Sequence, residues 1–298
     1  MKFLKQIISH PDFFITKFSK LPARPCLVFI HGGPGMNASA LEYLIEHKPL
    51  FEKLDYDMIF YHQRGCGRSK DFINEPTHQD NINDLNEIYH FLIGSQGLKI
   101  HGFIGHSYGA KLLFDFYQQF NINIPGIFVA IADSMLTPRI NNLLLDLKYL
   151  QSVDNQKYLT ALAAMENLDL QKLWDLTEEL NPLFLQNTAR TKMYWANLAC
   201  YEELQQIPKE FNLPISKKTF MSVRKDLYSS LEKCSVDIDK LNIPFIWING
   251  LHDYIMNGQD ALFRNTNKVI FFKSAHYPHI EENDRFCRVV NDFLAGNN

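Results

Sequence analysis

The stretch Ile100-His-Gly-Phe-Ile-Gly-His-Ser-Tyr-Gly109 decides the fold of this 298-residue chain. Its apolar run, residues 100–104, has the length of a buried strand, and a helical pattern at residues 110–120 follows directly. Between them, Gly105-His-Ser-Tyr-Gly109 fits the pattern G-x-S-x-G. The glycines are needed because a sharp strand-to-helix turn brings the two elements too close together for a Cβ. We therefore expect Ser107 to be an exposed nucleophile in a strained turn at a helix N-terminus.

Other short apolar runs, which end at glycine or polar residues, predict further buried strands. These runs are residues 26–30, 58–61, 127–131, 244–248 and 268–272. Helical patterns lie between them, for example at residues 81–93, and another follows the last run at residues 282–294. Because strands alternate with helices, we predict an α/β fold with a mostly parallel central sheet flanked by helices.

The pattern changes in residues 134–240, where no strand-like run occurs and leucines recur at helical spacing. The recurring positions are Leu143, Leu144, Leu147 and Leu150, then Leu159 and Leu162, then Leu173, Leu176 and Leu180, and a last helical pattern covers residues 193–204. We predict that residues 134–240 form an all-helical cap inserted between two core strands. Residues 1–133 and 241–298 are then the two parts of the α/β core.

The composition restricts the class of ligand and the compartment. The chain is 46% hydrophobic, enough to build a full core, and its net charge of −3 argues against a nucleic-acid partner. Its five cysteines lack the C-x-x-C spacing of a metal or redox site, so we expect free thiols in a reducing compartment. No apolar run has the length of a signal sequence or a membrane span. We expect a cytoplasmic protein with no membrane partner, no metal and no organic cofactor; the sequence leaves its oligomeric state open.

A second glycine motif, His31-Gly-Gly-Pro-Gly35, follows the first predicted strand. Successive glycines let a backbone approach a substrate carbonyl and point N–H groups at it. We predict that the N–H groups of Gly33 and Tyr108 form an oxyanion hole, with Gly32 beside them in the substrate-binding site. His31 is expected to hold the loop in place by hydrogen bonds rather than to act as a base.

A serine hydroxyl is too weakly acidic to attack unaided, so it needs a base and an acid that orients the base. In the chain order typical of this turn, the acid follows the serine and the histidine comes last. Asp253 and His276 each follow a predicted strand, so both lie at the carboxyl ends of strands, as Ser107 does. We predict Ser107, Asp253 and His276 as the catalytic residues. Asp133 is the alternative acid, and His279 is the alternative base.

Together these motifs resemble the α/β-hydrolases and, among them, the proline iminopeptidase family. The resemblance rests on His31-Gly-Gly-Pro-Gly35, on Tyr61-His-Gln-Arg-Gly-Cys-Gly-Arg-Ser69, and on the segments around Ser107, Asp253 and His276. It covers residues 22–133 and 241–298. It implies a serine hydrolase with a helical cap over the site, which releases N-terminal residues, often proline, from short peptides.

The chain departs from the family's pattern in several places. His62 stands where the second motif usually has an aspartate, and Tyr254 follows the predicted acid where one branch has a glutamate that binds the substrate's amino group. Another branch has a Trp-Glu pair in its cap, and Tyr201-Glu202 is its counterpart here. Because a buried ammonium group needs a paired carboxylate, Glu202 is a candidate substrate-binding residue. Tyr254 is a second candidate because of its place directly after the predicted acid. Other cap acids that could pair with an ammonium group are Glu166, Glu178 and Glu203.

The substrate class therefore has alternatives. The main one is a carboxylesterase or amidase with the same mechanism, since a leucine-rich cap also suits an apolar acyl group. A protein that binds a small molecule without turnover is the alternative from another class. The serine at position 107 argues against an epoxide hydrolase or a haloalkane dehalogenase, because these relatives need an aspartate there.

Overall fold

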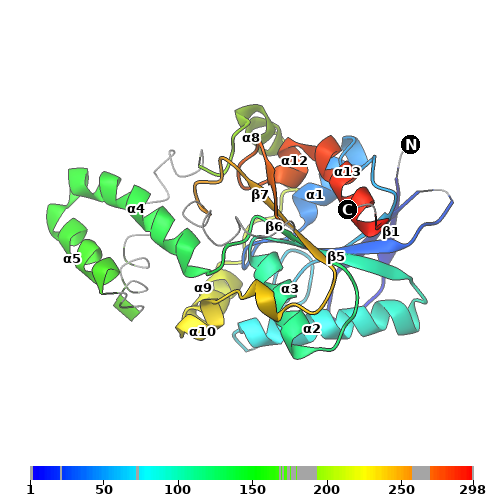
Figure 1. Cartoon of the computed structure of the whole chain (residues 1–298), viewed down its shortest axis with the longest axis horizontal. Helices are drawn as coiled ribbons and strands as arrows, with labels where there is room; N and C mark the ends of the chain where they lie inside the picture. Colours follow the sequence, from blue (N-terminus) through cyan, green and yellow to red (C-terminus); the bar gives the residue numbers. More distant parts are fainter. Residues whose placement is uncertain are drawn as a thin grey trace.

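An eight-stranded sheet forms the middle layer of the computed structural model (Figure 1). The structure describes residues 3–20, 22–71, 74–167, 169, 171–172, 175, 179, 193–256 and 269–296. Within these ranges, the strands are β1 (Leu4–Ile8), β2 (Ile15–Ser19), β3 (Cys26–Ile30), β4 (Asp57–Tyr61), β5 (Ile100–His106), β6 (Gly126–Val129), β7 (Phe245–Gly250) and β8 (Val269–Phe272).

The strands lie in the order β1-β2-β4-β3-β5-β6-β7-β8. Strands β3 to β8 run parallel to one another, and β1 and β2 extend one edge in antiparallel pairing. The predicted α/β fold with a mostly parallel sheet is confirmed. Because parallel strands present their carboxyl ends at one edge of a sheet, the loops that follow β3, β5, β7 and β8 lie along the same edge.

All six strands predicted from apolar runs are present, with shifts at their ends. β5 continues to His106, and β6 stops at Val129, where Ala130 adopts a positive φ of 51°. The sequence analysis missed β1 and β2. Four of the five residues of β1 are exposed, so its sequence, Leu4-Lys-Gln-Ile-Ile8, lacks the continuous apolar run of a buried strand.

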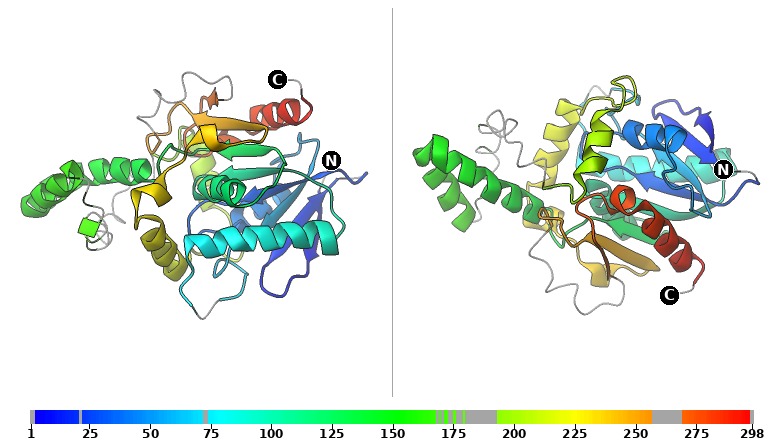
Figure 2. Two further views of the ribbon diagram at one scale, coloured as in Figure 1. Left: turned by 60° about the horizontal axis from the view of Figure 1, so that its bottom comes forward. Right: turned by 90° about the horizontal axis from the view of Figure 1, so that it is seen from above.

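Helices cover both faces of the sheet (Figure 2). α2 (His78–His90) and α3 (Tyr108–Gln119) pack on one face, and α1 (Ser39–His47) and α13 (Asn283–Leu294) pack on the other. A π-helical turn, η1 (Phe91–Ser95), extends α2, and the short α12 (Pro278–Glu281) precedes α13. α2 begins at a capping box in which Thr77 and Asp80 each accept the other's backbone N–H.

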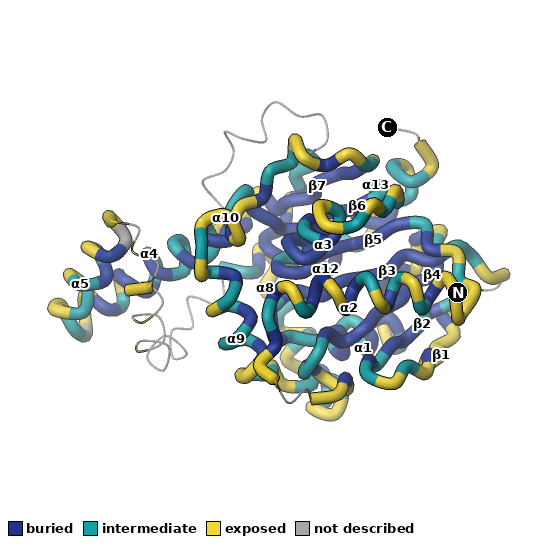
Figure 3. Tube along the Cα trace, turned by 90° about the horizontal axis from the view of Figure 1, so that it is seen from below, coloured by how far each residue is buried: buried dark blue, intermediate teal, exposed yellow. Residues whose placement is uncertain are grey.

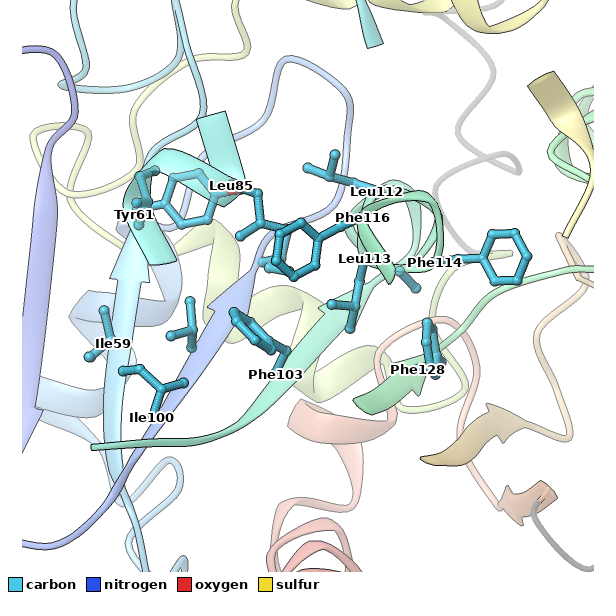
Figure 4. Packing of buried hydrophobic residues seen from close by; sticks show 14 of the residues in the cluster. Ile59, Tyr61, Leu85, Ile100, Phe103, Leu112, Leu113, Phe114, Phe116 and Phe128 are labelled. Carbon is cyan, nitrogen blue, oxygen red and sulfur yellow. The ribbon is translucent and has the colours of Figure 1, made fainter. Parts of the chain in front are cut away.

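The core between the sheet and α3 is strongly aromatic (Figure 4). The ring of Phe116 on α3 packs edge-on against Phe103 on β5, with 5.6 Å between the ring centroids. Leu112 and Leu113 are fully buried beside them. Burial of each such side chain contributes about 1.5–3 kcal/mol. This packing presses α3 onto β5 and fixes both ends of the turn at Ser107.

The chain between β6 and β7 contains helices but no strand in its described residues; a single bridge pairs Ser134 with Ser235. The elements are α4 (Leu136–Val153), α5 (Asn155–Glu166), α8 (Leu198–Gln205), α9 (Lys217–Leu227), α10 (Leu231–Cys234) and η2 (Ile238–Lys240). α4 and α5 form a hairpin that projects away from the sheet (Figures 1 and 3). The predicted helix at 193–204 is wrong over residues 193–197, which form a turn before α8. Leu173, Leu176 and Leu180 lie outside the described residues.

None of the helices in the described ranges combines the length and the apolar character that a membrane crossing requires.

Candidate active site

Ser107 lies in the turn between β5 and α3. Its backbone has φ 55° and ψ −121°, a combination that residues with a side chain rarely adopt. The N–H of Ser107 donates a hydrogen bond to the carbonyl oxygen of Val129 at 2.8 Å, which ties the turn to the neighbouring strand β6. A half-buried serine in a strained turn at the start of a helix is the geometry of a nucleophile elbow.

Steric contacts explain the two glycines that flank this serine. A Cβ on Gly109 would lie 2.2 Å from the carbonyl oxygen of Ile30. A Cβ on Gly105 would lie 2.6 Å from the carbonyl oxygen of Gly109. Both contacts are with backbone atoms, which cannot move aside as the end of a side chain can. The start of α3 therefore passes directly over the ends of β3 and β5.

The loop after β3 lies against the same turn. A Cβ on Gly32 would lie 3.3 Å from the Cβ of Ser107, and Gly33 has a φ of 137°. The Nε2 of His31 accepts a hydrogen bond from the N–H of Gln63 at 3.1 Å, and the Gln63 side chain donates to the His31 carbonyl at 3.0 Å. Burial lowers the pKa of His31 to about 3, so the ring stays neutral and accepts this bond.

The two backbone N–H groups predicted to form the oxyanion hole belong to this turn and to the loop that lies against it. One belongs to Tyr108, the first residue of α3, and the other to Gly33, which follows Gly32. In the part of the chain that the structure describes, neither group donates a hydrogen bond. Because the first N–H groups of a helix lack intrahelical acceptors, the one on Tyr108 is available to a bound oxygen atom.

The structure brings Asp253 and His276 together from the loops after β7 and β8. Their side chains are 2.8 Å apart, measured from His276 Nδ1 to Asp253 Oδ2. The other carboxylate oxygen of Asp253 accepts hydrogen bonds from the N–H groups of Ile255 at 3.1 Å and Met256 at 3.3 Å. Both side chains are buried, with residue exposures of 1% for Asp253 and 4% for His276. An aspartate that is bonded in this way holds the imidazole in one orientation.

His106 connects this pair to the turn at Ser107. Its Nε2 donates a hydrogen bond to the carbonyl oxygen of His276 at 2.8 Å, and the centroids of the two rings are 5.0 Å apart. Burial holds the pKa of His106 well below its ordinary value, and the neighbouring His279 and His276 lower it further. The sequence analysis assigned no role to His106. The pattern G-x-S-x-G gives no signal for one, because this position takes any residue.

The two alternative residues have other surroundings. His279 is buried, with its ring 4.6 Å from that of His106 and 5.4 Å from that of Phe29, and burial lowers its pKa to about 3. Asp133 follows β6; its backbone carbonyl accepts a hydrogen bond from Val236 at 2.7 Å, and burial raises the pKa of its carboxyl. The carboxylate that bonds His276 is that of Asp253.

The residues predicted to bind an amino group do not converge in the described structure. Glu202 is exposed on α8, and Glu203 beside it pairs with Lys48 at 2.7 Å. Glu166 is exposed at the end of α5. Tyr254 is 56% exposed and lines a hollow of about 520 Å³ next to the loops that carry Asp253 and His276. Glu178 lies outside the described residues.

The motif at residues 61–69 braces the neighbouring loops. Arg64 binds both carboxylate oxygens of Asp84, one of them at 2.6 Å from Nε. His62, at the position where an aspartate was expected, accepts the N–H of Arg68 on Nδ1 at 2.9 Å. Burial raises the pKa of the Cys66 thiol to about 12, which disfavours the reactive thiolate.

All five cysteines are free. Among the described residues, no group of three or more His, Cys, Asp or Glu side chains is arranged to hold a metal ion.

This sheet order and the turn that carries Ser107 define an α/β-hydrolase. The family model of the alpha/beta hydrolase fold matches residues 25–283, and the chain belongs to this family. Among curated proteins, a proline iminopeptidase of Saccharolobus solfataricus is 26% identical over 289 residues, which covers 90% of this chain and 84% of the relative. A proline iminopeptidase of Thermoplasma volcanium is 20% identical over 282 residues, covering 91% and 89%. These relatives confirm the expected resemblance.

Solved structures agree on the fold. A proline iminopeptidase-related protein from Thermus thermophilus superposes with a TM-score of 0.66 at 16% identity, covering 99% of this chain and 98% of that one. An esterase from Exiguobacterium antarcticum superposes with a TM-score of 0.64 at 15% identity, covering 99% of both chains. One scaffold therefore carries both a peptidase-related protein and an esterase, so the fold does not choose between the two substrates.

Proposed function

We propose that this hydrolase acts by acyl transfer through Ser107. The observation that supports this most strongly is the 2.8 Å hydrogen bond between His276 and Asp253, which lies beside the strained turn of the serine. Ser107 attacks the carbonyl carbon, His276 takes the hydroxyl proton and later returns it to the leaving group, and Asp253 orients the imidazole. Water then cleaves the acyl-enzyme by the same sequence of proton transfers.

The hydrogen-bonding roles support this assignment. An ionised carboxylate only accepts, so the Nδ1 of His276 carries the proton that is shared with Asp253. Nε2 is then the basic nitrogen, and it makes no hydrogen bond within the described residues. A base whose second nitrogen is held by a carboxylate is ready to accept a proton from a serine hydroxyl.

In this proposal the N–H groups of Gly33 and Tyr108 stabilise the negative charge that develops on the substrate oxygen. Both are fixed in the backbone, so they need no reorganisation during the reaction. Removal of one donor from such a site typically costs about 10²–10³-fold in kcat. Gly32, in the same loop, lets the backbone pass close to Ser107, because a Cβ there would lie 3.3 Å from the Cβ of Ser107.

We extend the proposal to the substrate. In this proposal residues 134–240 supply the cap: the segment before α8 lies against His276, whereas the α4–α5 hairpin projects away from the sheet (Figure 1). The protein is then an aminopeptidase that releases N-terminal residues, proline among them, from short peptides. The two curated relatives named proline iminopeptidase support this choice. Glu202 is our candidate partner for the substrate's amino group, with Tyr254 at the edge of the acyl site.

A carboxylesterase or amidase is the second candidate. A specific observation favours it: Glu166 and Glu202 are both exposed, and Tyr254 occupies a position where a glutamate would serve an aminopeptidase. An ester needs no buried carboxylate, because it carries no ammonium group. A binding protein without turnover is the third candidate.

A fluorophosphonate probe tests the mechanism, because it reacts covalently with an activated serine. The wild-type protein should be labelled, and Ser107→Ala should stay folded and unlabelled. Labelling of Ser107→Ala at the wild-type rate would reject Ser107. Proline and other amino-acid arylamides, compared with p-nitrophenyl esters, test the substrate: ester cleavage without arylamide cleavage supports the esterase, and saturable binding without labelling supports the binding protein.

A further inference from the structure

We propose that Glu281 is a positioning residue for His276. Its carboxylate joins the loop that carries His276 to the segment Tyr194-Trp-Ala-Asn197, which directly precedes α8 in the helical insertion. The inference rests on the proposed role of His276 as the general base. No motif singled out Glu281, which is the last residue of the short α12.

Both oxygens of this carboxylate are engaged by backbone N–H groups. Oε1 accepts from Ala275, the residue before His276, at 2.9 Å. Oε2 accepts from Ala196 at 2.8 Å and from Asn197 at 2.7 Å. Hydrogen bonds to an ionised acceptor are about twice as strong as neutral ones, so a single side chain clamps two segments that are far apart in the sequence.

The same two segments are joined by further contacts that act on His276 itself. The N–H of His276 donates to the carbonyl oxygen of Tyr194 at 3.1 Å. The Tyr194 ring meets the imidazole edge-on, with 5.3 Å between the centroids. Trp195 stacks on Tyr277, with centroids 4.2 Å apart and an interplanar angle of 10°. The segment that Glu281 holds is therefore a wall of the His276 site.

These contacts leave Nε2 of His276 as the ring nitrogen that can accept the proton of Ser107. The backbone N–H of His276 is held by Tyr194, its backbone carbonyl by His106 and its Nδ1 by Asp253, so a shift of this backbone would move the ring relative to Asp253. Glu281 acts on that backbone from both sides, through Ala275 and through the segment that supplies the Tyr194 carbonyl.

The surroundings of Glu281 fit this task. It is half-buried, and burial raises its pKa, while backbone N–H groups oppose the shift because they stabilise the carboxylate. It borders the 520 Å³ hollow together with His252 and Lys273. The titratable side chains around His276 itself are Asp253, His106, His279, Tyr194 and Tyr277.

The test separates the reactivity of Ser107 from the amount of folded protein. Glu281→Gln keeps the size of the side chain, but its NH₂ group cannot accept a hydrogen bond. The variant therefore loses the bonds either to Ala275 or to Ala196 and Asn197. The control is Asp284→Asn, which removes the same charge three residues away at a side chain that is 72% exposed. Fluorophosphonate labelling is followed over time, so that its final extent counts competent sites and its rate constant measures their reactivity.

We expect the rate constant of labelling and kcat on the best substrate to fall about 10- to 100-fold in Glu281→Gln, because small misplacement of a catalytic group has costs of this order. KM and the final extent of labelling should stay within twofold of the wild type, and Asp284→Asn should match the wild type throughout. A merely structural role would lower the extent and leave the rate constant unchanged, and that result would overturn the inference.

If Glu281→Gln does not fold, Glu281→Asp takes its place, because its carboxylate keeps the charge but is too short to reach both Ala275 and the Ala196–Asn197 backbone. A slower rate constant in this variant supports the inference, and an unchanged one overturns it. Wild-type protein that is never labelled would overturn the proposed function, and this inference with it. A labelled wild type with unchanged rate constants in the variants would overturn the inference alone.

Discussion

Replacement of the buried His279 by leucine should make the protein less sensitive to acid. The imidazole of His279 is 1% exposed and packs against the rings of Phe29, Phe51 and Phe286, and its Nδ1 has no hydrogen-bond partner in the described structure. Burial is the main cause that lowers its pKa to about 3. A protonated ring in this apolar site would be an unpaired buried charge, so the folded protein keeps it neutral.

The size of the effect follows from proton linkage. In the unfolded chain the ring takes up a proton below its ordinary pKa of about 6.5, whereas in the folded protein it does so only near pH 3. Between these values the unfolded state binds one more proton, so the free energy of unfolding falls as the pH falls, by up to about 1.4 kcal/mol per pH unit. From pH 7 to pH 5 the loss from this one group amounts to about 2 kcal/mol.

The assay is urea unfolding of the wild type and of His279→Leu at pH 7, 6 and 5. Leucine is apolar and of similar size, so it suits the surrounding rings and removes the titration. Between pH 7 and pH 5 the variant should lose about 2 kcal/mol less of its unfolding free energy than the wild type loses. His90→Leu on the exposed end of α2 is the matched control, because water surrounds that ring in both states. A difference between the wild type and His279→Leu that stays constant over this range would refute the reasoning.

Three other variants test the site and its scaffold. Asp253→Asn should lower kcat about 10⁴-fold with KM little changed, because the amide favours the wrong imidazole tautomer; steady-state kinetics that show less than a tenfold loss would contradict this role. Gly109→Ala should destabilise the fold by about 3 kcal/mol or more, since its Cβ would lie 2.2 Å from a backbone oxygen, and a wild-type urea midpoint would disprove the contact. Asp84→Asn should cost about 1.5–3 kcal/mol in urea unfolding, because it removes the charged acceptor of two Arg64 hydrogen bonds and leaves Asp80 at 3.7 Å as the nearby carboxylate, and Arg64→Met in the same chain should recover part of the loss.

Local sterics explain why the turn at Ser107 could be predicted. The requirement for glycine at 105 and 109 arises within one strand, one turn and one helix, and the positive φ of Ser107 is part of that same turn. The six buried strands could be predicted for a similar reason, since a strand covered on both faces needs a continuous apolar run. β1 and β2 lie towards an edge of the sheet, and the exposed residues of β1 gave no such signal.

Contacts at long range could not be predicted in the same way. In the sequence, Glu281 cannot be told apart from the other acidic residues of surface helices. Only the fold brings it to Ala196 and Asn197, some 85 positions earlier in the chain. Glu202 shows the converse: the sequence predicts a substrate-binding role for it, but its side chain on α8 is exposed to solvent.

By itself the sequence determined the α/β class, the elbow that carries Ser107 and the loop that begins at His31, because each depends on which residues one short segment of backbone can accommodate. Only the tertiary structure decided that His276 Nδ1 lies 2.8 Å from Asp253 Oδ2, and that the backbone carbonyl of His276 accepts a hydrogen bond from His106, 170 positions away in the chain. The physical reason is that such meetings depend on how parallel strands and their covering helices pack, which is a property of the whole sheet rather than of any segment in it.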